Sequence, residues 1–154
     1  MSKFVIPKLI FSVLSCLSAL ILGWASLITP VLAEVPLSHA PKDAEAFIIS
    51  PQDGSVVSET FTVKFGLSGM KVAPAGEQKT GTGHHHLLID LPEPPDLQTA
   101  LPANDNIRHF GAAQTETELT LSPGEHTLQL VLGNYAHVPH DNPVISQPIQ
   151  ITVK

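Results

Sequence analysis

Short apolar runs alternate with clusters of proline, glycine and polar residues from residue 46 to the end of the sequence. The segment TFTVKFGL, residues Thr60–Leu67, alternates strictly between apolar positions and polar or glycine positions. This alternation is typical of an antiparallel strand with one buried face. Five further segments have the composition of strands bounded by turn residues, namely 47–49, 84–91, 117–121, 126–132 and 144–153.

No stretch of ten or more residues in this region has the periodicity of a helix. About six to seven short strands separated by turns predict an all-β fold, namely a small immunoglobulin-like antiparallel β-sandwich. A jelly roll or a small barrel is the alternative architecture. We expect one domain over residues 46–154, which is long enough to bury an apolar core of its own.

Turn residues predict how the strands are connected. The turn SPGE, residues 122–125, predicts a hairpin between the two segments that flank it, because proline fixes φ and glycine accepts a positive φ. The connection Pro92–Ile107 contains four prolines and cannot be a central strand. Pro148 predicts that the last strand is an edge strand or has a bulge. Phe110 predicts that the segment RHFGAAQTE, residues 108–116, packs as a loop under the sheet.

The first residues have the three parts of a secretory signal peptide. Lys3 and Lys8 are positive, Leu9–Ile28 is almost wholly apolar, and small residues end at Ala33. We expect a signal peptide at residues 1–33, cleavage after Ala33, and a periplasmic or extracellular location. An uncleaved membrane anchor is the alternative, because the apolar stretch approaches the roughly 20 residues that span a bilayer.

Removing the signal peptide changes the chemistry of the chain. It removes Cys16, the only cysteine, so the remaining domain forms no internal disulfide. The formal charge moves from −6 to −8, because Lys3 and Lys8 are lost and all fourteen acidic residues remain. The other lysines and the arginine are scattered, which argues against nucleic acids and anionic membrane surfaces as partners. Residues 34–45 are polar and contain proline, so we expect a flexible leader there.

Three consecutive histidines, His84, His85 and His86, begin the segment 84–91. Side chains alternate between the faces of a strand, so His84 and His86 share one face with Leu88, and His85 lies on the core face. The two imidazoles of the first face lie about 7 Å apart along the strand. Both can therefore lean onto one metal ion, as paired histidines on a strand do.

Other segments supply further candidate ligands. The loop after segment 126–132 carries two histidines, and another ends the proline-rich connection. If the strand that begins at His84 pairs antiparallel with the strand that ends near Gly133, His84 lies close to that loop. The predicted metal ligands are His84, His86, His137, His109 and His140. Imidazoles without a thiolate suit Cu(II), Zn(II) or Ni(II).

The same histidines have an interpretation that involves no metal. Buried imidazoles can simply form hydrogen bonds with backbone carbonyls, and a histidine-rich loop can respond to pH. His126 is in phase with Leu128 and Leu130, so we interpret it as a capping histidine or one at the rim of the core.

Four motifs in order resemble one family of exported bacterial proteins, the domain of unknown function 4399. They are GHHHLLID (83–90), RHFGAAQTE (108–116), LSPGEHTLQLVLGNYAHVPH (121–140) and PVISQPIQITV (143–153). The resemblance covers residues 46–154 and implies export, and it brings no activity, substrate or catalytic residue with it.

Three functions are compatible with these observations. The first is an exported, non-catalytic binding domain that holds Cu(II) or Zn(II) through the histidines. The second is an interaction or structural domain that recruits a protein of the cell envelope without metal. The third is a small metal-dependent enzyme, because His84, His86 and Asp90 are similar to the ligand set of cupin enzymes. The sequence has no nucleophile elbow, phosphate loop or HExxH motif, which favours a non-catalytic role. The oligomeric state is left open.

Overall fold

Residues 37–154 are described by the computed structural model. The predicted signal peptide at residues 1–33, its cleavage after Ala33 and the alternative membrane anchor lie outside these residues. Residues 37–154 contain no helix that is long and apolar enough to cross a membrane.

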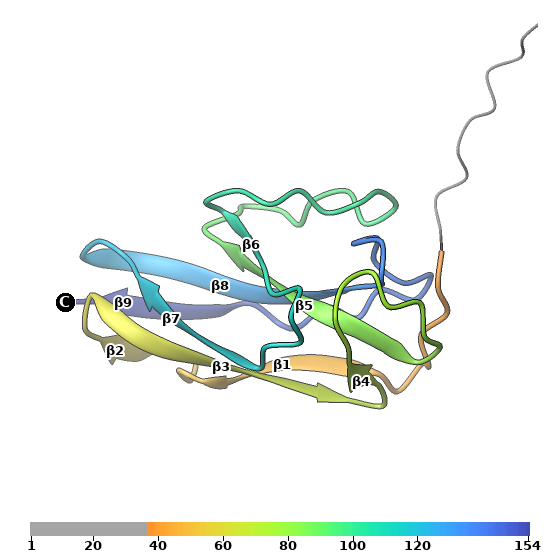
Figure 1. Ribbon diagram of the computed structural model, residues 1–154. Helices are drawn as coiled ribbons and strands as arrows, with labels where there is room; N and C mark the ends of the chain where they lie inside the picture. Colours follow the sequence, from red (N-terminus) through yellow and green to blue (C-terminus); the bar gives the residue numbers. More distant parts are fainter. Residues whose placement is uncertain (1–36) are drawn as a thin grey trace, which may run out of the picture. The chain divides into compact units, whose positions relative to one another are not determined.

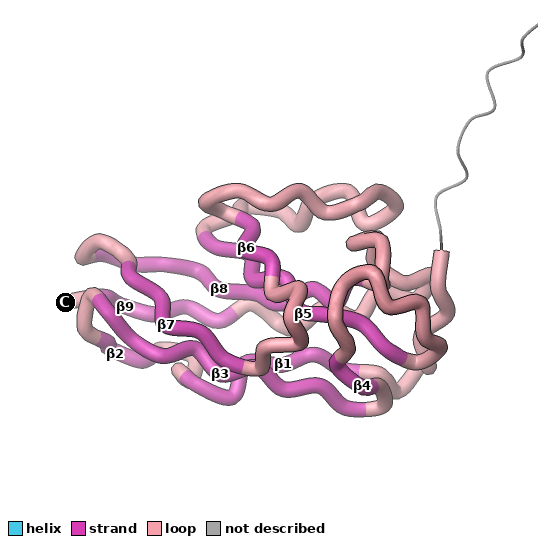
Figure 2. The backbone as a smooth tube through the Cα atoms, viewed as in Figure 1, coloured by secondary structure: helices cyan, strands magenta, loops and turns pink. Residues whose placement is uncertain are grey.

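The described part of the chain consists of strands, turns and loops arranged in two layers (Figures 1 and 2). The strands are β1 (Glu45–Ser50), β2 (Ser55–Val57), β3 (Thr60–Ser68), β4 (Lys71–Val72), β5 (Thr82–Ile89), β6 (Ile107–His109), β7 (Glu116–Thr120), β8 (Gly124–Gly133) and β9 (Ile149–Val153). One sheet has the order β1-β3-β7, and the other has the order β2-β9-β8-β5-β4, with β6 also paired to β5. Neighbours are antiparallel except for the pairs β2–β9 and β4–β5, which are parallel.

The predicted all-β, immunoglobulin-like sandwich is confirmed. The six strands of five or more residues, β1, β3, β5, β7, β8 and β9, overlap the six segments that the sequence pattern predicts. The additional strands β2, β4 and β6 have two or three residues each and lie at the edges of the larger sheet.

The turn at residues 122–125 does not close a hairpin. β7 pairs with β3, whereas β8 pairs with β5 and β9, so the turn carries the chain from one sheet to the other. The predicted hairpin is therefore wrong. Proline and glycine specify a reversal of chain direction, but the same reversal can join neighbours within a sheet or strands of two facing sheets.

The last strand is not an edge strand, because β9 lies between β2 and β8. Pro148 comes directly before β9 and interrupts the predicted segment 144–153. The residues before the interruption still lie beside β8, since the Leu132 amide donates to the Val144 carbonyl and the Ser146 amide donates to the Leu130 carbonyl. The proline, which has no N–H to give to a neighbouring strand, thus marks a break in the pairing.

All eight residues of β5 are buried. Leu87 and Ile89 belong to the main core between the two sheets. Leu88 points the other way and packs with Leu101, Ile107 and Val131 in a second apolar cluster. The connection between β5 and β6 covers this outer face of the larger sheet (Figure 1). His84 and His86, in phase with Leu88, therefore point to the outer face beneath this layer, as the alternation predicts.

The described part of the predicted flexible leader, residues 37–45, packs against the domain. Ala40 has no exposed surface and belongs to the main core. Its amide donates to the Asp141 carboxylate at 3.2 Å, and the Asp141 amide donates to the Ser38 carbonyl at 3.0 Å. These contacts join the described part of the leader to the loop after β8, and the flexibility of residues 34–45 stays a prediction.

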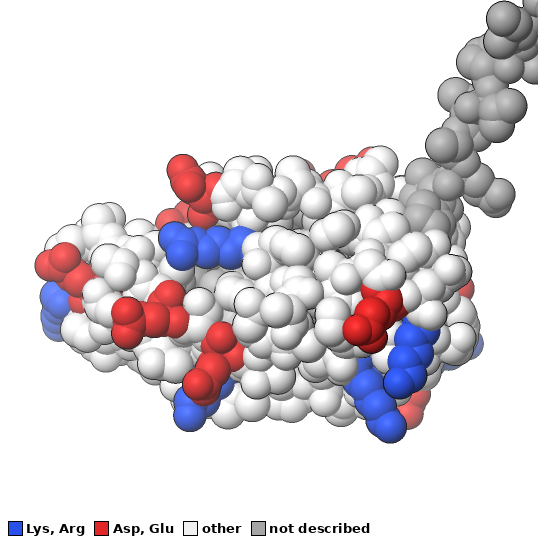
Figure 3. Space-filling model, in the orientation of Figure 1, with Lys and Arg blue, Asp and Glu red and all other residues white. Residues whose placement is uncertain are grey.

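Basic and acidic side chains are intermixed on the face of the domain that Figure 3 shows. Lys64 of β3, for example, lies 3.8 Å from Glu116 of β7. The exclusion of nucleic acid and of anionic membrane surfaces stays a prediction from the sequence.

Candidate metal centre

The outer face of β5 provides the first histidine of the cluster. His84 lies opposite Gly133 in the antiparallel pairing of β5 with β8. This is the neighbour relation that the sequence analysis expects, and it places His84 beside the loop that follows β8. The His84 side chain has no exposed surface.

β6 brings His109 to the same face, because His109 lies opposite His86 in the pairing of β5 with β6. The next residue, Phe110, anchors this segment. Its amide donates to the His85 carbonyl at 3.0 Å, and its ring packs in the main core at 4.8 Å from the ring of Phe65. The prediction that Phe110 packs this loop under the sheet is confirmed, and the packing also fixes the position of His109.

The turn after β8 supplies His137, which has a positive φ of 67°. Asn134 organises this turn: its side-chain oxygen accepts from the amides of Ala136 and Val138, at 2.8 and 3.1 Å. The His137 amide in turn donates to the Asn134 carbonyl, and the His137 carbonyl accepts from Leu101 of the outer layer. A left-handed backbone in a non-glycine residue costs energy, and strain of this kind is concentrated at functional sites.

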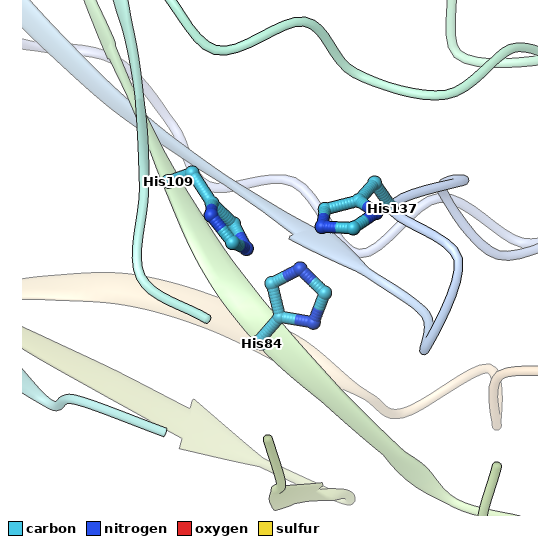
Figure 4. A group of neighbouring side chains, drawn as sticks. All are labelled: His84, His109 and His137. Atoms are coloured by element: carbon cyan, nitrogen blue, oxygen red, sulfur yellow. The ribbon is translucent and has the colours of Figure 1, made fainter. Parts of the chain in front are cut away.

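The three imidazoles point toward one another (Figure 4). Their ring centroids are 4.9 Å apart for His84–His109, 5.0 Å for His84–His137 and 4.7 Å for His109–His137. One nitrogen from each ring lies within 4.8 Å of the other two. Three atoms no more than 4.8 Å apart lie at most about 2.8 Å from a point between them. Small side-chain rotations would therefore bring them to the roughly 2.0–2.1 Å of a zinc–imidazole bond.

His86 borders this group. Its ring centroid lies 4.8 Å from that of His84, 5.1 Å from that of His109 and 6.0 Å from that of His137. The three-residue group whose nitrogens converge does not include it. His86 therefore lies where it can support the other rings or complete a fourth position.

Many ring nitrogens here have no hydrogen-bond partner. Both nitrogens of His84 and of His86 and Nε2 of His109 are buried and unpartnered. A buried polar atom without a partner costs about 1–3 kcal/mol, so the isolated cluster is energetically expensive. The second predicted role for the histidines, hydrogen bonds with backbone carbonyls, is seen for His140, whose Nε2 faces the Thr82 carbonyl.

Two of the imidazoles, those of His84 and His86, have a pKa far enough below its usual value to be uncharged at neutral pH. Burial, and after it the proximity of His109 and His137, lowers the pKa of His84 to about 4. Burial and the neighbouring imidazoles lower the pKa of His86 to about 3. Burial and His137 also lower the pKa of His109. Neutral imidazole is the form that binds a metal ion.

His140, the fifth predicted ligand, lies outside the converging group. Its Nε2 donates to the Thr82 carbonyl at 3.3 Å, and the residue is buried. His85 is also buried, but on the inner face, with its ring 5.3 Å from that of Phe65. Of the five predicted ligands, the structure brings together His84, His109 and His137, with His86 beside them.

Asp90, the carboxylate of the cupin comparison, is engaged elsewhere. Its Oδ2 accepts from Nδ1 of His126 at 2.7 Å, and its Oδ1 accepts from the Thr127 amide at 2.9 Å. His126 also donates through Nε2 to the Ser122 carbonyl at 2.8 Å. The interpretation of His126 as a capping histidine agrees with these bonds, and the cupin-type ligand set does not form.

Sequence reasoning missed two residues that shape the cluster. The sequence pattern places Asn134 in a loop without indicating its role, although asparagine is a frequent organiser of turns through its side-chain oxygen. The sequence pattern indicates only that Gly111 is a small loop residue, whereas it leaves room for an imidazole, because a Cβ at this position would overlap Cε1 of His109.

A sequence model of the domain of unknown function (DUF4399) matches residues 63–154. The chain belongs to this family. The matched region includes every histidine of the cluster. No curated protein matches the sequence.

One similar solved structure comes from a study of the fibronectin(III)-like modules of Clostridium thermocellum CbhA. It has 12% sequence identity and a TM-score of 0.39, and the alignment covers 71% of this chain. The alignment spans 45% of that chain, so less than half of the other protein is compared.

Proposed function

We propose that this DUF4399 domain is an exported, non-catalytic binding domain that holds one divalent transition-metal ion, Cu(II) or Zn(II), through His84, His109 and His137. The convergence of three buried or half-buried imidazoles, of which His84 and His109 have buried nitrogens without a hydrogen-bond partner, carries the proposal. Zinc and copper are bound by imidazole in many proteins, and the ion would satisfy the nitrogens that no hydrogen bond reaches. The signal-peptide pattern at residues 1–33 supports a location outside the cytoplasm.

The alternatives have less support. A metal-free interaction domain gives no physical reason for imidazoles to converge. It also leaves the cost of removing these imidazoles from water uncompensated. A cupin-type enzyme needs a carboxylate near His84 and His86, but Asp90 is held by His126. The convergent group offers three imidazole ligands to an ion.

Titration calorimetry with Cu(II) and Zn(II), on the chain prepared without a histidine tag, tests the proposal. We expect one ion per chain with micromolar or tighter affinity. His84→Ala, His109→Ala and His137→Ala should each weaken binding at least tenfold, since each removes one of three ligands.

His39→Ala is the matched control. It removes an exposed imidazole that pairs with Asp141, outside the cluster. Its affinity should equal that of the unchanged protein. Absence of binding in the unchanged protein, or undiminished binding after His84 and His137 are both replaced, would refute the proposal.

A further inference from the structure

The converging group of side chains contains no negative charge. Among the residues that the structure describes, the search for neighbouring imidazole, thiol and carboxylate ligands finds His84, His109 and His137 and no acidic member. Because imidazoles bind as neutral ligands, an ion at this position keeps its full charge.

The surroundings of the ion are also poorly solvated. The ring nitrogens of His84 and Nε2 of His109 are buried, and His137 is half-buried. The outer apolar cluster of Leu88, Leu101, Ile107 and Val131 continues along the same face of the sheet. The free energy of taking an ion out of water rises with the square of its charge, so a dication is penalised more than a monocation.

The number of ligands also favours a monocation such as Cu(I) over Cu(II). Three nitrogens converge, and His86 lies farther from His137, at a ring distance of 6.0 Å. Cu(II) favours a tetragonal arrangement of at least four ligands, whereas three imidazoles satisfy Cu(I). The protein holds its ligands on a strand, on an anchored loop and in a hydrogen-bonded turn, which resists rearrangement toward a square plane.

We infer that copper in this cluster is held as Cu(I) in preference to Cu(II), to a greater degree than by free imidazole. This inference rests on the proposed function and specifies the oxidation state that the site favours. The chemistry is a single step in which Cu(II) gains one electron to become Cu(I), with no ligand proton gained or lost. Copper that binds as Cu(II) would therefore be reduced to Cu(I) in this domain by weaker one-electron donors than those that reduce copper bound to free imidazole.

A redox titration of the copper-loaded full chain tests this inference. The Cu(II) paramagnetic resonance signal is followed as ascorbate, a one-electron donor, and mediator dyes set the potential, with copper in excess imidazole as reference. We expect the protein to favour Cu(I) over Cu(II) at least tenfold more than the reference does, which corresponds to a midpoint about 59 mV higher. A midpoint equal to or below the reference would overturn the inference.

The metal content of the desalted protein separates the two claims. If neither copper nor zinc is retained, the proposed function and this inference fail together, and if zinc is retained without copper, only this inference fails. If copper is retained with an unshifted midpoint, the metal site stands and only the preference for Cu(I) fails.

A matched pair of variants tests the role of charge. His86→Asp places a carboxylate beside the ring of His84, and His86→Asn places a neutral group of the same size there. The aspartate variant should have the lower midpoint, because a negative charge favours Cu(II) over Cu(I). Identical midpoint potentials in the two copper-loaded variants would show that charge near the ion does not control the reduction of Cu(II) to Cu(I).

Discussion

At the scale of single residues, glycines make room for the imidazoles of the cluster. A Cβ on Gly111 would lie 2.3 Å from Cε1 and 2.5 Å from Nε2 of His109. A Cβ on Gly133 would lie 2.7 Å from Cε1 of His86. Contacts below 3.0 Å are not tolerated, so these rings keep their positions only because the neighbouring residues lack side chains.

Gly111→Ala should therefore displace His109 and weaken metal binding at least tenfold while the domain stays folded. Calorimetric titration measures the affinity and circular dichroism reports the fold. Gly66→Ala is the control, because its Cβ would meet the ring of Phe47 on the neighbouring strand β1. Both residues lie in the sheet β1-β3-β7, which does not carry the cluster. Gly66→Ala should lower stability without changing affinity. Equal affinities in the two variants would speak against the role of Gly111.

His126, which is not a member of the converging group, makes a second residue-scale arrangement. Its two ring nitrogens face a carboxylate oxygen of Asp90 and the carbonyl oxygen of Ser122. Both partners accept hydrogen bonds, so both nitrogens must carry a proton and the ring is cationic in this arrangement. The hydrogen bond with Asp90 accordingly raises the pKa of His126.

The raised pKa of His126 determines how its contribution to the free energy of unfolding changes with pH. His126 binds its proton more tightly in the folded chain, so its contribution is complete below the unfolded value near 6.5 and is lost as the pH rises through the folded value. His126→Gln should lower the free energy of unfolding by roughly 1 kcal/mol more at pH 6 than at pH 9. The expected difference is no larger, because solvent screens the partly exposed carboxylate of Asp90.

Urea unfolding at both pH values measures the difference. Asp90→Asn, which removes the charge on the other side of the pair, should reproduce the same dependence on pH. A loss of stability that is equal at pH 6 and pH 9 would show that the ring is not held as a cation.

At the scale of secondary-structure elements, strand alternation predicted the faces of β5 correctly. Leu87 and Ile89 lie in the main core, and Leu88 lies in the outer cluster, as the period of two requires. The pairing of His84 with the end of β8 also followed from the sequence. What the sequence did not contain was the choice of partner for β7, because the local residues of a turn do not specify which sheet receives the next strand.

The convergence of the cluster depends on three elements that are not neighbours in sequence. β5 is central and buried, whereas β6 has three residues and the turn at 134–138 is an irregular segment. His140 shows the limit of prediction from spacing: it lies three residues after His137 and yet turns to the Thr82 carbonyl. The direction of a loop side chain is decided by its local hydrogen bonds.

A metal ion that joins these elements should slow the opening of the outer layer. The Leu101 amide donates to the His137 carbonyl, so it reports on the turn that carries His137. We expect its hydrogen exchange to slow at least tenfold when the ion is added, because opening then requires loss of a ligand. The Leu121 amide, bonded to the Glu59 carbonyl, is the internal control and should not change. Unchanged exchange at Leu101 in metal-loaded protein would argue against a bridge between these elements.

At the scale of the whole molecule, the two faces of β5 differ in how they contribute to stability. The main core between the sheets is ordinary and apolar, with residues such as Leu119, Leu128 and Leu130 fully buried. The opposite face of β5 instead buries imidazoles with unpartnered nitrogens. Such groups lower stability unless something binds them, so the ion should contribute to folding.

The free energy of unfolding should therefore increase by about 2.7 kcal/mol when the free ion is present at one hundred times its dissociation constant. Thermal or urea unfolding with and without the ion measures this increase. His84→Ala should lose the increase, and His126→Gln, which leaves the cluster intact, should retain it. An equal increase in the two variants would mean that the ion binds elsewhere.

The most direct test of the metal site is anomalous diffraction from a crystal of the copper-loaded or zinc-loaded protein, collected at the absorption edge of the metal. We predict a single strong peak between the rings of His84, His109 and His137, about 2.0–2.1 Å from one nitrogen of each. A peak at another position, such as the surface pair of His39 and Asp141, with none between the three rings, would contradict the account.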